Sequence, residues 1–181
     1  MPKPAGDHGG RTTPERDDAF GSAMIAHGDG LARLAYFLCG DRHRAEDLVA
    51  EAFAAVWPRW SSGRVDELLP YLRRTLVNLA AKDRRHRFVV RHHDERATPA
   101  PTAPAADHDL WLHVDLAAAL RILPAPQRVV VVLRYLEDMT EAEMATLLAV
   151  APGTVKSRLS RGLFSLRQSL QRPSREERRG D

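Results

Sequence analysis

The stretch TEAEMATLLAVAPGTVKSRLSRGLFSLRQSL, residues 140–170, has the pattern of two helices joined by a short turn. Thr140 and Glu143 have the spacing of a capping box, in which a hydroxyl and a carboxylate each satisfy a backbone donor at a helix start. Residues 149–151 then make the turn. Pro152 suits the first position of a second helix, because its missing N–H needs no partner there. The segment therefore predicts a helical hairpin.

The second helix of this hairpin has two unlike faces at about 100° per residue. Its apolar face consists of Val155, Leu159, Leu163, Leu166 and Leu170. Its polar face and flanks include Thr154, Lys156, Ser157, Arg158, Ser160 and Arg161. In a helix-turn-helix, the first helix crosses the phosphates and the second offers its N-terminal half to the major groove. The pattern favours a DNA-reading helix, and a packed hairpin with a solvated basic side remains the alternative.

The positive charge of the chain is unevenly distributed. The 181 residues have a formal net charge of +3 and a pI of about 9.4. Basic side chains gather in residues 73–96 and 156–179, and all but three of the 27 lysines and arginines of the whole chain are arginines. Such clustering indicates a polyanionic partner, and arginine suits phosphate and base-edge contacts.

Cys39 is the only cysteine, so an internal disulfide is excluded and a reducing compartment is expected. No run of about 18 apolar residues is present, and the first residues lack the apolar core of a signal peptide. These observations predict a cytoplasmic protein.

The N-terminal half predicts a disordered tail followed by two helices. Residues 1–18 lack apolar periodicity, whereas apolar residues then recur at helical spacing up to Gly40, a natural left-handed stop. Asp41 can cap the next helix. We expect that helix to end at Pro58, and we expect Trp60 to lie in the loop that follows.

A third helix is predicted from Pro70, with one continuous polar stripe. Arg74, Asn78, Lys82 and Arg85 form this stripe, and Arg84 is among the residues that widen it. Such a surface can hold a nucleic-acid backbone while an asparagine touches bases. An arginine-rich face that is merely solvated is the alternative.

A Pro/Ala-rich segment, residues 98–106, predicts a flexible linker and a domain boundary. With its flanks, at ~3 Å per residue, it can span ~45–60 Å, so two modules could touch separated sites on one duplex. Residues 110–123 resume helical spacing. For the valine run in residues 127–136 we predict helix, because no other segment offers a strand partner.

Three blocks of the sequence resemble extracytoplasmic-function (group IV) sigma factors of bacterial RNA polymerase, in the sigma-70 family. They are GDRHRAEDLVAEAFAAVWPRW, YLRRTLVNLAAKDRR and LPAPQRVVVVLRYLEDMTEAEMATLLAVAPGTVKSRLSRGL. The resemblance covers most of residues 20–170. It implies an all-α chain of two small helical domains joined by the linker, without cofactor or catalytic activity. A protein of this family would bind core RNA polymerase and promoter DNA. It would associate with the nucleoid in holoenzyme and be a monomer when free.

The resemblance also implies boundaries and sites. A tail (1–18) precedes sigma region 2 (19–96), and a linker (97–109) precedes sigma region 4 (110–172) and a second tail (173–181). Core-polymerase contacts map to Glu46, Asp47, Leu48, Glu51 and Phe53. The −10 element would be read by Trp60, Ser61, Arg74, Asn78, Lys82, Arg84 and Arg85. The −35 element would be read by Thr154, Lys156, Ser157, Arg158, Ser160 and Arg161.

Three positions depart from the family pattern: Ala50 stands where glutamine is usual, Ala149 where the turn glycine is usual, and Ala151 where a serine cap is usual. A left-handed alanine costs about 1–2 kcal/mol and a missing cap costs ~1 kcal/mol. Phe164 points outward on the helical wheel, and we hypothesise that it docks onto the polymerase flap or an anti-sigma protein.

Two other function classes are compatible with parts of the chain. A free-standing helix-turn-helix regulator would need only the C-terminal block, and would leave the acidic helix and the Asn78 helix unexplained. An enzyme could use a metal held by His86, His92, His93, Asp94 and Glu95, but their spacing matches no standard metal site.

Overall fold

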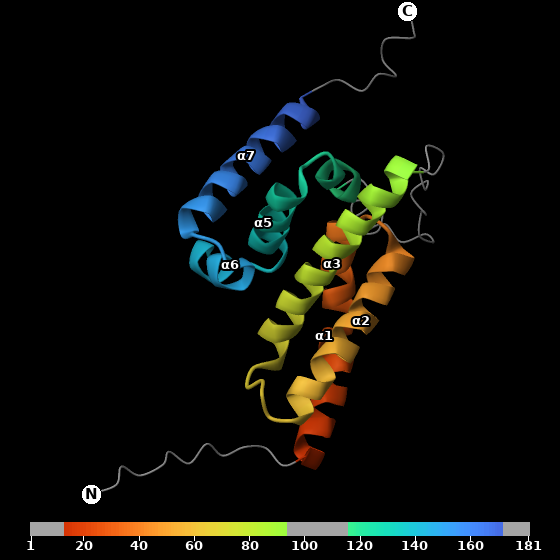
Figure 1. Ribbon diagram of the computed structural model, residues 1–181. Helices are drawn as coiled ribbons and strands as arrows, with labels where there is room; N and C mark the ends of the chain where they lie inside the picture. Colours follow the sequence, from red (N-terminus) through yellow and green to blue (C-terminus); the bar gives the residue numbers. More distant parts are fainter. Residues whose placement is uncertain (1–12, 94–115, 172–181) are drawn as a thin grey trace, which may run out of the picture.

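The computed structural model describes residues 13–93 and 116–171, and within these ranges the chain is helical, without strands (Figure 1). The helices are α1 (Thr13–Cys39), α2 (Arg42–Ser61), α3 (Leu68–His93), α5 (Ala125–Leu136), α6 (Glu141–Leu148) and α7 (Pro152–Leu170). Residues 116–121 form a further short helical segment before α5. The expected linker at 97–109, the start of the second domain and the C-terminal tail from 172 lie outside the described residues.

Helices α1, α2 and α3 form a three-helix bundle, which we call the N-terminal block. Leu34, Leu48, Leu72 and Leu76 are fully buried between the helices. Asp41 caps α2 as predicted, since its carboxylate accepts a hydrogen bond from the Arg44 N–H at 2.8 Å.

Helix α1 begins at Thr13, so the prediction of a disordered tail was wrong for residues 13–18. The reason is a contact with the end of α2. The Arg16 guanidinium lies 5.0 Å from the centroid of the Trp60 ring. Arg16 Nη1 donates to the Trp60 carbonyl at 3.0 Å, and Trp60 Nε1 donates to the Arg16 carbonyl at 2.8 Å.

Pro58 does not end α2, which continues to Ser61. The prediction of a stop at Pro58, with Trp60 in a loop, was therefore wrong. Val56 and Trp60 are almost completely buried, on either side of the proline. Their burial stabilises the last helical turn by more than the hydrogen bond that proline removes.

Residues 116–171 form the C-terminal block. Its valine run is helical, as predicted, with Val130, Val131 and Val132 buried in α5. The predicted capping box of α6 is present: the Thr140 hydroxyl accepts from the Glu143 N–H, and the Glu143 carboxylate accepts from the Thr140 N–H at 2.7 Å.

The turn between α6 and α7 has the two features expected from its alanines. Ala149 adopts a left-handed conformation with φ of 52°. Ala151 stands at the N-cap of α7 and offers no side-chain hydrogen bond to the helix. Pro152 opens α7 as predicted.

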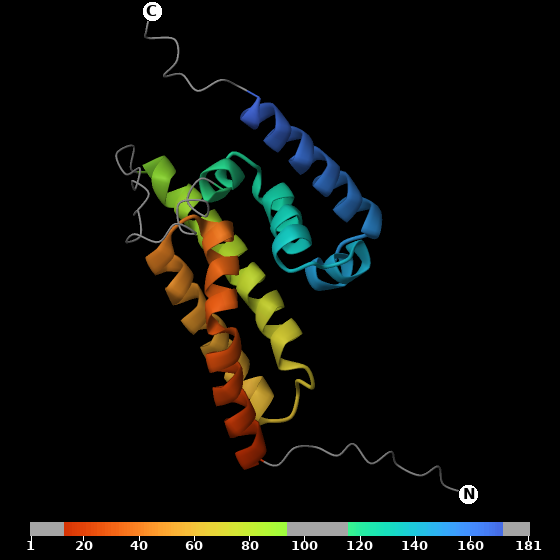
Figure 2. The same cartoon turned by 180° about the vertical axis from the view of Figure 1, so that it is seen from behind.

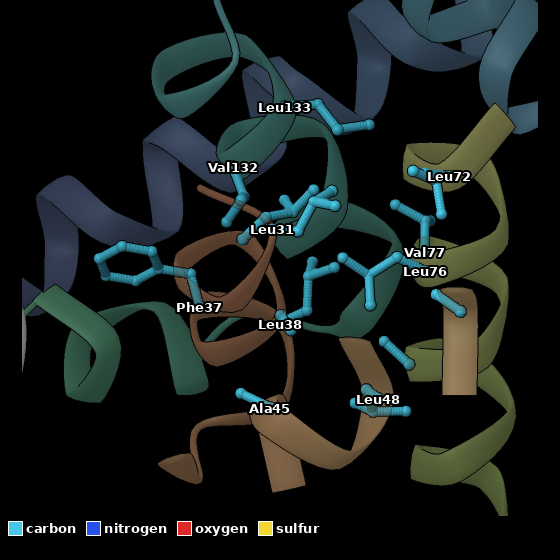
Figure 3. Packing of buried hydrophobic residues seen from close by; sticks show 14 of the residues in the cluster. Leu31, Phe37, Leu38, Ala45, Leu48, Leu72, Leu76, Val77, Val132 and Leu133 are labelled. Atoms are coloured by element: carbon cyan, nitrogen blue, oxygen red, sulfur yellow. The ribbon is translucent and has the colours of Figure 1, made fainter. Parts of the chain in front are cut away.

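The two blocks pack against one another and share one hydrophobic core (Figures 1 and 2). In Figure 3, Leu31 of α1 lies beside Val132 of α5, and Leu38 of α1 lies nearer to Leu76 of α3. All four are buried. The sequence predicts two modules able to reach separate sites, and the structure shows these modules in contact.

Candidate nucleic-acid interface

The polar stripe of α3 is exposed along its length. Arg74, Asn78, Lys82 and Arg85 all lie on the surface, spaced along one side of the helix. This agrees with the pattern read from the sequence. Arg74 lies about two turns from Lys82, and Lys82 lies about one turn from Arg85, so the three cations can neutralise phosphates along one strand. The Asn78 amide in the stripe can donate to and accept from a base edge.

The seven residues expected to read the −10 element are called the −10 set. Arg84 is placed differently from the rest of this set. It is half-buried and lines a groove against Ala125 and Pro126 of α5. Its positive charge helps to lower the pKa of Arg128 of α5, after the larger effect of burial. In this arrangement its side chain faces the C-terminal block.

The first half of α7 carries the six residues expected to read the −35 element, which are called the −35 set. Lys156, Ser160 and Arg161 are exposed, and Thr154, Ser157 and Arg158 are partly buried. Arg161 Nε donates to the Ser157 carbonyl at 3.2 Å, and its Nη2 lies at the same distance from the Ser157 hydroxyl. These bonds hold the guanidinium along the helix and would reduce the side-chain entropy lost if Arg161 contacted DNA.

A hollow of about 360 Å³ adjoins this face of α7. Thr154, Ser157, Arg158 and Arg161 line one side, and the start of α5 lines the other with Pro124, Pro126 and Gln127. Gln127 Oε1 is buried without a hydrogen-bond partner. No sequence pattern marks Gln127, because its proximity to α7 depends on the tertiary packing of α5.

A larger groove of about 700 Å³ lies between the blocks, and residues of both predicted DNA-binding sets line it. Asn78 and Arg85 of α3 line it together with Arg158 of α7. Val77, Val129 and Leu148 make its floor apolar. The two polar faces therefore share one groove in this arrangement, which no sequence pattern indicated.

Trp60, one of the residues expected to read the −10 element, has a structural role. The Trp60 side chain is 1% exposed and bonded to Arg16, so it presents no ring face on which a base could stack. The prediction that Trp60 reads the −10 element is corrected: Trp60 anchors α2 to α1. The Ser61 hydroxyl lies 3.4 Å from the Pro58 carbonyl, at the last turn of the helix.

The acidic face of α2 is exposed at Glu46, Asp47 and Glu51. Arginines of the same helix accompany it: Arg42 pairs with Glu46 at 3.1 Å, and Arg44 pairs with Glu51 at 2.8 Å. Arg44 also binds Asp83 of α3 at 2.8 Å. Burial would lower the pKa of Arg44, but the hydrogen bonds to Glu51 and Asp83 raise it above its usual value. The acidic face is thus braced against α3.

Leu48 and Phe53 do not belong to this face. Leu48 is fully buried and Phe53 is 5% exposed, with its ring edge-on to Phe20 at 5.5 Å between centroids. The prediction that they contact a partner is corrected: both fill the core of the N-terminal block. Their apolar spacing in the sequence fits a core position equally well.

Comparison with known proteins identifies the family. Residues 24–87 match the model of sigma-70 region 2, and residues 113–164 match that of sigma-70 region 4. The RNA polymerase sigma-E factor of Streptomyces coelicolor is 36% identical over 146 residues, which cover 78% of this chain and 80% of that protein. The ECF RNA polymerase sigma factor SigL of Mycobacterium tuberculosis is 33% identical, with 80% and 85% covered.

The chain belongs to the ECF RNA polymerase sigma factors. These proteins direct promoter-specific initiation by core RNA polymerase, and that is the function of this chain at the level of the family. A further relative, SigE of Mycolicibacterium smegmatis, is 35% identical over 83% of this chain, which spans 61% of the length of that protein.

Two solved structures share the fold. The sigma factor RpoE of Bartonella quintana, in complex with the anti-sigma factor NepR, has a TM-score of 0.67 at 24% identity, covering 87% of this chain and 99% of its own. CnrH, in complex with the cytosolic domain of CnrY, has the same TM-score at 21% identity, covering 90% and 94%. Both support the all-α fold of a sigma factor.

Two features are absent from residues 13–93 and 116–171. No helix among them is long and apolar enough to cross a membrane. No group of three or more histidine, cysteine, aspartate or glutamate side chains within these ranges is arranged to hold a metal. Of the metal set weighed from the sequence, His92 and His93 have no described side chains, and Asp94 and Glu95 lie outside the described ranges.

Proposed function

We propose that this sigma factor reads the −10 element with α3 and the −35 element with α7, and binds core polymerase through the acidic face of α2. One observation carries the proposal: Asn78 is exposed between Arg74, Lys82 and Arg85, on a helix separate from the basic face of α7. A chain that recognises one site needs only one such helix. We assign region 2 to residues 19–96 and region 4 to 110–172.

Reconstituted transcription tests this proposal. Purified core polymerase and the chain should start transcripts at defined sites on a cognate promoter, whereas core alone should not. A free-standing helix-turn-helix regulator or an enzyme would leave core polymerase without specific starts, and that result would reject the proposal. The proposed protein acts by binding alone, as a monomer when free, and catalyses no reaction itself.

Asn78 should govern sequence preference at the −10 element. Replacement by alanine removes a base-edge contact of about 1–3 kcal/mol, so the penalty should depend on the base at one promoter position. Asn78→Ala transcription on promoters with each base at that position measures this. An equal loss on every promoter would show a scaffolding role instead.

Phosphate contacts should account for most of what four basic residues contribute to promoter affinity: Arg74, Lys82, Arg158 and Arg161. For each phosphate that is neutralised, promoter affinity falls by about 0.9 log unit per log unit of increase in salt concentration. Lys82→Ala should therefore reduce the slope of promoter affinity against salt by about one, and should weaken all promoters alike. An unchanged slope would remove Lys82 from the phosphate contacts.

We also propose that Phe164 contacts an apolar partner, either the polymerase flap or an anti-sigma protein. Its side chain is 63% exposed on α7, beyond the −35 set, as the helical wheel predicts. Both solved neighbours were determined with protein partners, and one of these partners is named as an anti-sigma factor. Phe164→Ser should weaken holoenzyme assembly or inhibitor binding while the fold is retained. Unchanged binding of both partners would reject the idea.

A further inference from the structure

A buried amide oxygen lies beside the −35 set. Gln127, in the first turn of α5, is half-buried, and its Oε1 atom is buried without a hydrogen-bond partner. The residue lines the hollow of about 360 Å³ whose other side is formed by Thr154, Ser157, Arg158 and Arg161 of α7. A buried acceptor without a hydrogen bond is unfavourable, because it has lost its contact with water. The donors that line the same hollow decide which group can satisfy it.

The main chain of Gln127 is fixed where α7 crosses α5 (Figure 1). A Cβ atom placed on Gly162 of α7 would lie 3.4 Å from Gln127 Cβ and 3.5 Å from its carbonyl oxygen. The Gln127 N–H donates to the Pro124 carbonyl at 3.0 Å, at the start of α5. Only the end of the Gln127 side chain is therefore free to turn within the hollow.

Most donors on the opposite side of the hollow are already engaged. The Ser157 hydroxyl donates to the Thr154 carbonyl at 3.0 Å. Arg161 Nε donates to the Ser157 carbonyl at 3.2 Å, and its Nη2 donates to the Ser157 hydroxyl at the same distance. No hydrogen bond or ion pair within the described residues holds the Arg158 side chain or the Thr154 hydroxyl. Arg158 has five N–H donors on a long stem, whereas Thr154 has one donor on a short branched side chain, so Arg158 is the better partner for Gln127.

A bond between Gln127 and Arg158 would help Arg158 to bind a phosphate. One edge of a guanidinium can donate to the amide oxygen while another edge donates to two phosphate oxygens. An arginine held in this way loses less side-chain freedom on binding. Because the amide is neutral, the guanidinium keeps its full charge for the phosphate, which a carboxylate partner would offset.

We propose that Gln127 is a positioning residue for promoter binding. In the promoter complex, Gln127 Oε1 accepts a hydrogen bond from the Arg158 guanidinium, and this bond directs the other edge of Arg158 to a phosphate of the −35 element. The unfavourable burial of the amide oxygen in the free chain is relieved in the complex. The inference rests on the function proposed above, in which α7 binds the −35 element and Arg158 contacts a phosphate. It adds α5 to the elements that serve −35 binding.

Gln127→Met tests the proposal, because it should change stability and DNA binding in opposite directions. Methionine is unbranched and similar in length, and its sulfur is only a weak acceptor. Replacing a buried oxygen that has no partner should raise the thermal unfolding midpoint of the free chain. A residue that only packs α5 against α7 would give a lower midpoint or no change.

The DNA readout is the slope of log promoter affinity against log salt concentration for holoenzyme. Fluorescence anisotropy of a labelled promoter fragment that supports specific starts, over a potassium chloride series, measures this slope. Gln127→Met should reduce its magnitude by about 0.9, which is the loss of one phosphate contact. A loss of stability alone would not change the number of phosphates that are neutralised.

Three further variants assign the effect. Arg158→Ala should reduce the slope by the same amount as Gln127→Met. The double substitution should reduce it no further, because both changes remove one shared contact. The matched control is Gln168→Met, which changes an exposed glutamine of α7 outside the hollow and should leave the slope unchanged.

The outcomes separate this inference from the proposed function. A reduced slope for Arg158→Ala with an unchanged slope for Gln127→Met would overturn the inference and leave the proposed function standing. Additive reductions in the double variant would show that Gln127 acts without Arg158, and would also overturn it. An unchanged slope for Arg158→Ala would contradict the phosphate contact assigned under the proposed function, and the inference would fail with it.

Discussion

The two blocks reach stability by different routes. The N-terminal helices α1, α2 and α3 have 27, 20 and 26 residues, whereas α5, α6 and α7 have 12, 8 and 19. Large side chains fill the first bundle, including the fully buried Trp60 and Phe37. The second block has a capping box on α6, but it also has two unfavourable features, a left-handed alanine and a helix start without a side-chain cap.

The difference follows from how much apolar area each helix can bury. Long helices present several turns to the core, so a local defect such as Pro58 is tolerated. An eight-residue helix is too short to be stable alone, and its ends contribute a larger share of its stability. We therefore expect the N-terminal block to respond most to changes in the core, and the C-terminal block to respond most to changes at turns and helix contacts.

Trp60→Ala should lower the free energy of unfolding more than any other substitution discussed below. Deleting this ring removes a buried aromatic and its bond to Arg16, at a cost of about 3–5 kcal/mol. Trp57 is the matched control, since it is one turn away but 37% exposed. Trp57→Ala should lower the free energy of unfolding far less. Chemical denaturation of both variants measures the difference. Equal losses would contradict the anchoring role of Trp60.

Gly162→Ala should destabilise the C-terminal block. The added Cβ would lie 2.9 Å from Val131 Cγ2 and 3.4 Å from Gln127 Cβ, where α7 crosses α5. Valine is stiff about χ1, so overpacking of about 1–3 kcal/mol should exceed the helix-propensity gain of about 1 kcal/mol.

Gly153 gives the matched comparison on the same helix. A Cβ at Gly153 meets nothing within 4 Å, so Gly153→Ala should stabilise the protein by about 0.5–1 kcal/mol. Thermal unfolding should shift in opposite directions for the two substitutions. A gain for both would show that α5 and α7 are less closely packed than the structure indicates.

Ala149→Gly should stabilise the α6–α7 turn by about 1 kcal/mol, because glycine adopts the left-handed conformation without the Cβ penalty. Ala142→Gly, in the exposed first turn of α6, should instead cost up to about 1 kcal/mol. Unfolding midpoints in urea measure both. The same sign for the two would mean that Ala149 carries no strain.

The capping box should make the smallest and most local contribution, and one that depends on pH. The hydrogen bonds from the Thr140 backbone, and then from its hydroxyl, lower the pKa of Glu143. A lowered folded-state pKa gives stability that is present above the unfolded value and is lost as pH falls through the folded value. Glu143→Gln should therefore be less stable than the unmodified chain at pH 7 and should approach it in acid. A gap that stays constant with pH would contradict the assignment.

Local signals in the sequence predicted much of the C-terminal block. Thr140 and Glu143 lie within one turn of helix, and Pro152 suits only a helix start, so their roles depend little on distant residues. The exposed stripe on α3 followed from helical periodicity alone. The family was predicted from the resemblance of three sequence blocks, and the matches to sigma-70 regions 2 and 4 confirm it.

Long-range contacts explain what the sequence did not predict. Arg16 and Trp60 are 44 residues apart, and their contact both extends α1 and removes Trp60 from the surface. Arg128 Nη1 donates to the Leu38 carbonyl, 90 residues away along the chain. Leu48 and Phe53 lie on a helix with apolar residues on more than one side, so spacing alone could not separate core from contact surface.

The central claim is that one chain uses two helices at two promoter sites. Site-specific cross-linking in the promoter complex with core polymerase tests it most directly, with a photoreactive side chain at exposed Lys82 of α3 or exposed Ser160 of α7. The Lys82 probe should label DNA at the −10 element, and the Ser160 probe should label DNA at the −35 element. Labelling of the same segment by both probes, or of no DNA by either, would contradict the claim.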